Sequence, residues 1–436
     1  MTFLQIYTVQ RGDSIYSIAR QFGVPASRII TDNILTNPGQ LVVGQDLVIL
    51  FPAVTHTVRG GETLSSIAAQ YNTSLLTLYQ NNPQLGGVPG IFPGQVLNIS
   101  YAPTALGNIL TNGYAYTNID RSVLRRTLPY LSYLSVFNYG ITEDGSLLPP
   151  PGDDSEIISI AKEYRTVPLL VLTSLTEAGT FSSDRAALVL NDPALRSRVI
   201  ESTVETVRTK GYGGVDVDFE YIPTASADAY VEFIILLQEA LGDDGVVFVS
   251  LAPKYRADQP GLLYEGHNYA ALGEAADNVL VMTYEWGYTY GPPRAVSPLP
   301  EVRRVLDYAV TEIPPSKIFM GVPNYGYDWP LPYVRGETKA QSLGNTAAVE
   351  QALQKSAAIE YDDTEQAPFF RYFDRPETYS DAVEHIVWFQ NARSADAQLR
   401  LVREYGLAGI GVWNIMRYFP SLWLVLHQLY TIEKRL

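Results

Sequence analysis

Short apolar runs, most of them rich in β-branched residues, alternate with helix-like spans in the chain after residue 100. Runs of this length between turn signals are typical of buried strands. The eight runs are ILTNGYAY (109–116), YLSYLSVF (130–137), VPLLVLTSL (167–175), GGVDVDF (213–219), VVFVSLAP (246–253), NVLVMTY (278–284), KIFMGVPNYG (317–326) and LAGIGVW (407–413).

The spans between these runs carry helical spacing. In 192–213, for example, Val199, Val204 and Val207 fall on or near one stripe, which Gly211 follows. Eight strands alternating with helices over about 330 residues predict an α/β fold, a (β/α)8 TIM barrel. A doubly wound open sheet is the alternative.

The interval between the seventh and eighth runs, at about 330–390, is longer than a single helix needs. Loops that follow barrel strands lie on the face where barrel enzymes keep their active sites. We therefore expect a small inserted α+β lobe on that face.

The first hundred residues contain a repeat. YTVQRGDSIYSIARQFGV at 7–24 aligns with HTVRGGETLSSIAAQYNT at 56–73, and the units close alike, in VGQDLVI at 43–49 and PGQVLNI at 93–99. Each unit predicts a strand, an amphipathic helix that Asp13 or Glu62 caps, a second helix, and a strand that pairs with the first. We divide the chain into two βααβ domains, 1–50 and 53–100, and a third domain, 101–436.

Charge is divided unevenly between these parts. Residues 1–100 hold four basic and four acidic residues, so the rest of the chain carries the whole net charge of −15. Such a surface repels phosphate backbones, which argues against nucleic acid as a partner. A neutral or solid substrate fits better, and we expect a monomer.

Other classes are disfavoured by what the sequence lacks. It has no cysteine, and its four histidines do not stand at metal-ligand spacing. We therefore expect no metal and no cofactor. No run of about 18 apolar residues predicts a membrane span, and the start of the chain lacks the basic and apolar regions of an ordinary secretion signal.

The stretch GGVDVDFE places Asp216, Asp218 and Glu220 at every second position of an apolar strand. Side chains at this spacing share one face, so the three acids enter the barrel while the intervening apolar residues meet the helices. Burying them costs several kcal/mol each unless they share protons, form close hydrogen bonds or reach solvent at the carboxyl end of the strand. The alternatives are a metal-free buried cluster of acids with a structural role, or a plain edge strand.

Carboxyl groups this close cannot all ionise, so one of them keeps its proton to unusually high pH. Glu220, the last of the row, lies nearest the opening and is suited to be a general acid. Glycoside cleavage needs such an acid and ordinarily a second carboxylate across the sugar. Asp218 is poorly placed for that second role because it lies on the same strand as Glu220.

GGVDVDFE resembles the DxxDxDxE signature of family 18 glycoside hydrolases, with Gly213 in place of the first aspartate. The resemblance implies that the 2-acetamido oxygen of the substrate is the nucleophile, through an oxazolinium intermediate and with retention. By position, Glu220 would be the acid/base, Asp218 would hold the acetamido N–H, and Asp216 would share a proton with Asp218.

Two further stretches match the same family. MTYEWGYTYGPP (282–293) resembles its MxYD region and offers Tyr284 for the acetamido oxygen, with Glu285 where aspartate is usual; GVWNI (411–415) offers Trp413 as the floor beneath the reacting sugar. Weaker candidates for substrate contact are Tyr325, Tyr114 and Asn138.

The repeats, with their TVxxGD/E opening and GQxL close, resemble LysM domains. That resemblance implies binding to N-acetylglucosamine-containing glycans such as peptidoglycan or chitin, in a groove between the entrance of the first helix and the loop before the last strand. The candidate contacts are Gly12, Asp13 and Ser14 in the first repeat and Gly61, Glu62 and Thr63 in the second.

Two LysM units ahead of such a barrel resemble the cortex-lytic and spore-envelope N-acetylglucosaminidases of endospore-forming bacteria. The sequence thus predicts a peptidoglycan N-acetylglucosaminidase that acts in the spore envelope or at the cell wall, held there by its two modules. A chitinase with the same chemistry is the alternative enzyme. A glycan-binding protein without catalysis is the alternative of another class.

Overall fold

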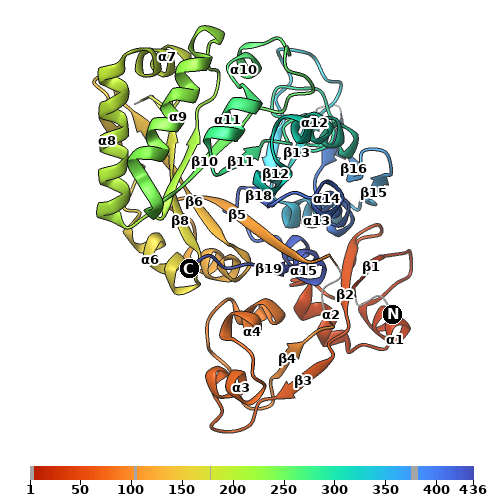
Figure 1. Ribbon diagram of the computed structural model, residues 1–436. Helices are drawn as coiled ribbons and strands as arrows, with labels where there is room; N and C mark the ends of the chain where they lie inside the picture. The colour runs from red at the N-terminus through yellow and green to blue at the C-terminus, as the bar shows by residue number, and fades with distance from the viewer. Residues whose placement is uncertain (1–3, 103–105, 177, 375–381) are drawn as a thin grey trace.

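The computed structural model describes residues 4–102, 106–176, 178–374 and 382–436. Its centre is a closed barrel of eight parallel strands (Figure 1). The strands are β5 (Asn108–Tyr116), β6 (Tyr133–Ile141), β8 (Val167–Thr173), β9 (Gly214–Asp218), β10 (Val246–Leu251), β11 (Asn278–Val281), β12 (Ile318–Pro323) and β18 (Gly409–Trp413). Because β5 pairs with both β6 and β18, the sheet closes, which confirms the barrel and excludes the open doubly wound sheet.

Helices surround the barrel on its outer side (Figure 1). They are α5 (Arg121–Thr127), α6 (Ser155–Glu163), α7 (Ser183–Asn191), α8 (Pro193–Lys210), α9 (Ala227–Leu241), α10 (Leu262–Glu265), α11 (Tyr269–Ala275), α12 (Leu299–Glu312), α14 (Ala392–Tyr405) and α15 (Pro420–Leu429). The sequence signals of α8 are explicit: the side chain of Asp192 accepts hydrogen bonds from the first turn, and Gly211 ends the helix at φ 77°. Short strands β7 (Leu147–Leu148) and β19 (Thr431–Ile432) extend the sheet.

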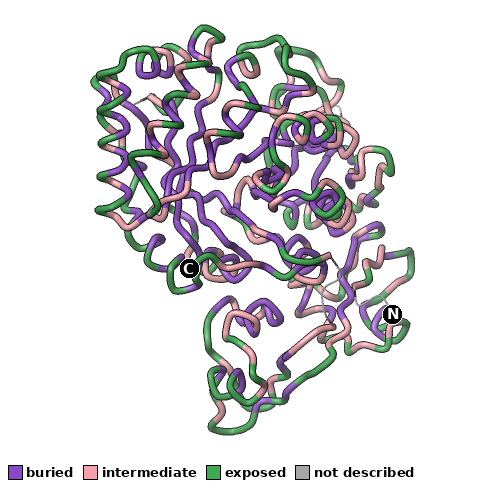
Figure 2. The backbone as a smooth tube through the Cα atoms, viewed as in Figure 1, coloured by how far each residue is buried: buried purple, intermediate pink, exposed green. Residues whose placement is uncertain are grey.

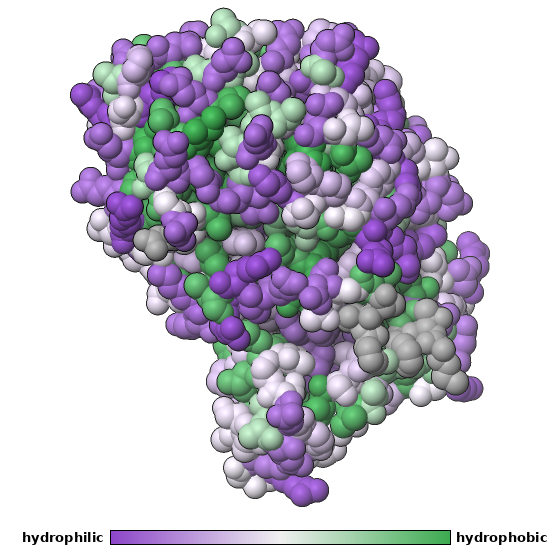
Figure 3. Space-filling model, in the orientation of Figure 1, coloured by the Kyte–Doolittle hydropathy of each residue, from purple (hydrophilic) through white to green (hydrophobic). Residues whose placement is uncertain are grey.

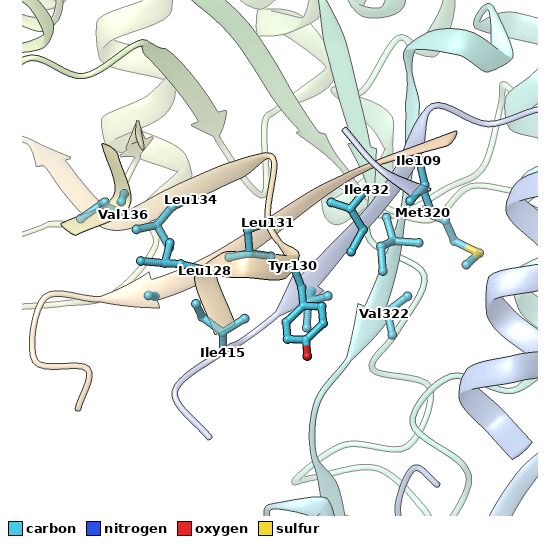
Figure 4. Packing of buried hydrophobic residues seen from close by; sticks show 14 of the residues in the cluster. Ile109, Leu128, Tyr130, Leu131, Leu134, Val136, Met320, Val322, Ile415 and Ile432 are labelled. Carbon is cyan, nitrogen blue, oxygen red and sulfur yellow. The ribbon is translucent and has the colours of Figure 1, made fainter. Parts of the chain in front are cut away.

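The core of the barrel has two apolar parts, one between strands and helices and one inside the barrel. Figure 2 shows the barrel strands buried along their length, with exposed positions mainly on the outer sides of the helices. Inside, Phe248 packs against Tyr133 and Phe319 with ring centroids 5.0 Å apart in both pairs. Outside, Leu131 and Ile415 lie 2.8 and 3.0 Å from where a Cβ at Gly113 would stand (Figure 4), so a side chain there would displace them.

The long interval between β12 and β18 forms the predicted lobe. Its five strands make an antiparallel sheet in the order β14-β13-β17-β16-β15, which the helix α13 (Asn345–Gln354) accompanies. The strands are β13 (Gly326–Pro330), β14 (Gln341–Leu343), β15 (Glu360–Asp362), β16 (Ala367–Asp374) and β17 (Val383–Trp388).

The two repeats fold as βααβ units, as the sequence predicts. The first contains β1 (Leu4–Thr8), α1 (Ile15–Phe22), α2 (Ala26–Asp32) and β2 (Asp46–Leu50); the second contains β3 (Val54–Thr57), α3 (Leu64–Gln70), α4 (Leu75–Asn81) and β4 (Val96–Ser100). In each unit the two strands pair antiparallel.

The predicted helix caps of the repeats are wrong by one residue. Ser14 and Thr63, rather than Asp13 and Glu62, accept the capping hydrogen bonds of α1 and α3. The carboxylate of Asp13 instead accepts hydrogen bonds from Tyr7 Oη and from the backbone N–H of Gln10, both at 2.7 Å. A short hydroxyl reaches the first turn of the helix, which frees the carboxylate to tie the preceding turn.

Both small domains pack against the barrel domain (Figure 1). In the first, the buried carboxylate of Asp46 pairs with Arg393 at 3.2 Å, and the Val43 carbonyl accepts a hydrogen bond from the Ile359 amide of the lobe at 2.9 Å. In the second, the carbonyl of Gln80 accepts a 2.9 Å hydrogen bond from Tyr130 Oη. The repeats are therefore fixed on the barrel rather than held by the chain alone.

Figure 3 shows a face covered mostly by hydrophilic side chains, with apolar ones in small areas. No helix among residues 4–102, 106–176, 178–374 and 382–436 is long and apolar enough to cross a membrane. In that same part of the chain, no group of three or more histidine or acidic side chains is arranged to hold a metal ion.

Candidate active site

The acid row starts on β9 and ends at the mouth of the barrel. Asp216 is fully buried, and its carboxylate accepts hydrogen bonds from Ser135 Oγ at 2.7 Å, Ser250 Oγ at 3.4 Å and Asn112 Nδ2 at 3.5 Å. Three other barrel strands, β5, β6 and β10, thus supply the donors that make a buried carboxyl tolerable.

Asp218 lies one layer nearer the mouth. Its Oδ1 atom is buried and has no hydrogen-bond partner among the described residues. No hydrogen bond joins Asp218 to Asp216 in this part of the chain, so the proton shared by these two residues stays a prediction. An unpaired buried oxygen is costly, and a ligand that donates an N–H to it would recover that cost.

Glu220 follows β9 by two residues and lines a cleft. Burial, and to a smaller extent the negative charge of Glu285, together raise its pKa to about 7. The pKa of Asp218 is also raised well above its usual range, first by burial and then by the charges of Glu220 and Asp216. Glu220 can therefore hold a proton near neutral pH at a solvent-connected position.

Glu285 comes from the loop after β11, with its backbone in the left-handed region at φ 69°. Its carboxylate accepts hydrogen bonds from Tyr325 Oη and, at 3.1 Å, from Tyr327 Oη. Burial raises the pKa of Glu285, and the two tyrosine hydroxyls act against that shift. Tyr325, just before the lobe, and Tyr327, on its strand β13, thus hold the carboxyl group of Glu285 in place near Glu220.

The cleft has two parts that meet at Glu285 and Trp413. The acid part, about 540 Å³, is lined mainly by aromatic rings and carboxyl groups from the loops after the barrel strands; the lobe part, about 500 Å³, is lined mainly by polar side chains. Two adjoining pockets of this volume at the carboxyl ends of barrel strands can hold several units of an extended chain.

Trp413 ends β18 and divides the two parts. Its ring lies 5.1 Å from Phe137, 5.7 Å from Tyr114 and 6.3 Å from Tyr116, centroid to centroid. These neighbours hold the indole face at the base of the cleft, where it can pack on the C–H face of a sugar.

The predicted site residues divide into two groups. Glu220, Asp218, Tyr284, Glu285 and Trp413 all line the acid part of the cleft, and Tyr325 lines the lobe part.

Three of the candidates lie elsewhere. Tyr114 is 2 % exposed and packs against Trp413, and Asp216 lies beneath the cleft. Asn138 donates a hydrogen bond to Thr173 Oγ1 at 2.8 Å. Neither Tyr114 nor Asn138 is among the residues that line the cleft, and Tyr114 contacts the lining residue Trp413; substrate contact by these two stays a prediction.

Sequence reasoning missed an aromatic group on the acid side of the cleft. Trp286 and Tyr288 lie in the quoted stretch around Tyr284 and could have been found there. Tyr255 lies in a loop and Tyr264 on the short helix α10, without any pattern that marks them, and only the closed barrel brings them to the cleft.

The LysM candidates lie on exposed loops, apart from two side chains. Gly12, Ser14, Gly61 and Thr63 are exposed. Asp13 ties its own turn as described above. The carboxylate of Glu62 likewise accepts a 2.7 Å hydrogen bond from the Arg59 amide and lies 2.8 Å from His56 Nε2.

Comparisons with known proteins agree with this geometry. The model of the glycosyl hydrolases family 18 matches residues 158–417, and that of the LysM domain matches 7–50 and 56–100. The cortical fragment-lytic enzyme of Bacillus subtilis (strain 168) is 38% identical over 440 residues, which cover 99% of each chain. That of Bacillus anthracis is 35% identical over 435 residues, covering 99% of this chain and 100% of the other.

Solved structures are similar as well. The spore cortex-lytic enzyme SleL of Bacillus megaterium QM B1551 is 38% identical, with a TM-score of 0.84 and all of both chains covered. The chitinase of Chromobacterium violaceum ATCC 12472 is 25% identical, with a TM-score of 0.67 over 73% of this chain and 98% of the other. The chain is a glycosidase that belongs to the glycosyl hydrolases family 18 and carries two LysM domains at its N-terminal end.

Proposed function

We propose that the protein hydrolyses spore cortex peptidoglycan, at the β-1,4 bond that follows N-acetylglucosamine. The observation that carries this proposal is a proton-holding Glu220 in a cleft whose described lining offers no carboxylate suited to be the nucleophile. Asp218 ends β9 and Glu220 follows it by two residues on the same side of the cleft, and two tyrosine hydroxyls donate hydrogen bonds to the carboxylate of Glu285. The nucleophile must then come from the substrate.

In the proposed reaction the 2-acetamido oxygen attacks the anomeric carbon while the bond to the leaving oxygen breaks. Glu220 gives its proton to that oxygen, and Asp218 accepts the acetamido N–H with its unpaired Oδ1. Tyr284 donates to the acetamido oxygen, and Trp413 carries the sugar ring. Water then attacks the anomeric carbon of the oxazolinium on the face opposite the acetamido oxygen and loses a proton to Glu220. Two successive inversions retain the configuration.

The choice of spore cortex rests on relatives that cover almost the whole chain and are named for cortex lysis. We accordingly propose action in the spore envelope or at the cell wall. The domain limits 1–50, 53–100 and 101–436 are part of this proposal, as is a monomeric state. The alternative substrate is chitin, which the similarity to a chitinase favours.

The LysM domains would hold the barrel on insoluble glycan. Because both repeats are packed on the catalytic domain, any glycan that they bind lies at a fixed distance from the cleft. Two weak glycan-binding sites fixed on the barrel raise the local concentration of the active-site cleft at the glycan. We expect Gly12, Asp13, Ser14, Gly61, Glu62 and Thr63 to form the loops that contact the glycan.

The decisive experiment is mass spectrometry of products from cortex peptidoglycan and from chitin oligomers. We expect peptidoglycan fragments with N-acetylglucosamine at the new reducing end, and proton NMR recorded during the reaction should show the β-anomer first. New reducing ends on muramic acid, or release of the α-anomer, would contradict the proposed bond or mechanism. Cleavage of de-N-acetylated chains at a comparable rate would contradict the assignment of the acetamido group as the nucleophile.

A further inference from the structure

The two parts of the active-site cleft differ in charge. The acid part contains Asp218, Glu220 and Glu285 among aromatic rings. The lobe part shares Glu285 and Trp413 with the acid part, and its other lining side chains are mainly hydroxyl and amide groups and Arg417. Among the described residues that line either part, Arg417 is the single cation.

The backbone that carries Arg417 is held in place. Asn324, 3 % exposed, donates from Nδ2 to the carbonyl of Asn414 at 2.9 Å and to the carbonyl of Arg417 at 2.8 Å. One buried amide thus ties both ends of the turn that follows β18. The arginine stem starts from a fixed point on the rim of the cleft.

The arginine stem also has a prepared path across the lobe. A Cβ at Gly344 would stand 2.8 Å from Arg417 Cδ and 3.7 Å from its Nε and Nη1 atoms. Any larger residue at position 344 would therefore push the side chain away. Glycine at this place lets the guanidinium lie between the barrel loop and the lobe.

The guanidinium of Arg417 has no partner among the described residues: within those ranges it forms neither an ion pair nor a hydrogen bond. In a chain with a net charge of −15, an arginine at a cleft with unused donors is available to an anion from the ligand. Its planar fork matches a carboxylate in particular.

The direction of the substrate chain decides which sugar meets this arginine. Glu220 protonates the leaving oxygen, so the leaving part of the chain lies on the acid side, toward Tyr221 and Tyr255. The part that is retained must extend past Trp413 into the lobe part. In peptidoglycan the sugar before the reacting N-acetylglucosamine is a muramic acid, whose lactyl group or peptide bears a carboxylate; in chitin that sugar is neutral.

We propose that Arg417 is a specificity residue that binds the carboxylate on the sugar preceding the reacting N-acetylglucosamine. The inference rests on the proposed function and deepens it, because it names the feature by which peptidoglycan differs from chitin in this cleft. Arg417 acts on binding and takes no part in the proton transfer at Glu220.

The test uses two substrates that differ in one group. The first is a tetrasaccharide of two N-acetylglucosamine–N-acetylmuramic acid repeats with free lactyl carboxylates, and the second carries methyl amides in their place. We expect the wild-type protein to show a kcat/KM about fivefold to tenfold higher for the acid, mainly through KM and less at high salt. In Arg417→Gln that ratio should fall to about one, and Arg417→Lys should keep part of it.

Arg335→Gln is the matched control, because Arg335 is an exposed arginine of the same lobe and lines neither part of the cleft. It should keep the wild-type ratio. Calorimetric binding of the acid tetrasaccharide to Glu220→Gln, with and without Arg417→Gln, checks the same contact without turnover. An unchanged substrate ratio or unchanged binding in the Arg417→Gln proteins would overturn the inference. Cleavage of neither substrate by the wild type would instead overturn the proposed function.

Discussion

The hydroxyl of Tyr325, where the chain enters the lobe, donates a hydrogen bond to the carboxylate of Glu285 after β11. Glu285 in turn raises the pKa of Glu220 through its negative charge. The lobe is thereby connected to the acid through one carboxylate. This connection makes the pH dependence of the enzyme a test of the site.

Replacement of Glu285 by glutamine should move the alkaline limb of the activity profile to lower pH. The negative charge of Glu285 favours the protonated form of Glu220, whose pKa is raised to about 7. Without that charge the pKa of Glu220 falls, so the acid loses its proton at lower pH, by roughly half a unit to one unit. The pH dependence of kcat/KM reports this pKa in the free enzyme.

Tyr325→Phe should move the same limb in the same direction but less, because the Tyr325 hydroxyl lowers the pKa of Glu285 and so keeps it charged. An alkaline limb that stays in place in both variants would show that Glu285 does not set the pKa of Glu220.

Glu220→Gln should reduce turnover by about a hundredfold or more, since loss of a general acid costs two to four orders of magnitude. Glycan binding should persist, because the amide fills the same space. Glu239→Gln, an exposed position on α9, is the control for loss of a carboxylate. Near-normal hydrolysis by Glu220→Gln would refute the assignment of the acid.

The same substitution should change stability in a pH-dependent way. Glu220 has a folded-state pKa raised from 4.5 to about 7, so the folded state binds the proton more tightly than the unfolded state. The wild type therefore loses stability as pH rises from 4.5 to about 7, by up to about 3 kcal/mol.

Glu220→Gln has no proton to lose at this position. The difference in the free energy of unfolding, Glu220→Gln minus wild type, should therefore be larger at pH 8 than at pH 4.5. Urea denaturation at these two pH values measures the difference. A difference between the two proteins that does not vary with pH would mean that Glu220 is not desolvated in the folded state.

The contact between the first LysM domain and the lobe can be tested with two equivalent glycines. Gly44 and Gly94 have nearly the same backbone, at φ 85° and 87°. A Cβ at Gly44 would stand 1.8 Å from the Ile359 carbonyl oxygen, whereas a Cβ at Gly94 would meet nothing within 4 Å.

Gly94→Ala should cost only the backbone strain, about 1–2 kcal/mol. Gly44→Ala should cost more and should also release the first domain from the lobe, because the two backbones can no longer approach. Thermal unfolding and limited proteolysis measure these effects. Equal losses in both variants would show that the contact with Ile359 does not stabilise the packing of the first domain.

Much of the protein follows from local sequence patterns. The period of two in GGVDVDFE fixes which face of β9 the acids share, and apolar runs with capping and terminating residues predict the strands and helices. These signals extend over a few residues, so they can be read without knowledge of the fold. The repeat at 7–24 and 56–73 is likewise visible as two copies of one pattern.

Only the tertiary structure decided which distant residues meet. Tyr325 and Glu285 are 40 residues apart, and Asp46 and Arg393 are 347 residues apart. No periodic pattern links such pairs, because their contact depends on the closure of the barrel and on the path of the lobe. The same reason applies to Arg417 over Gly344: sequence determines what each strand can bury, and closure determines which side chains share the cleft.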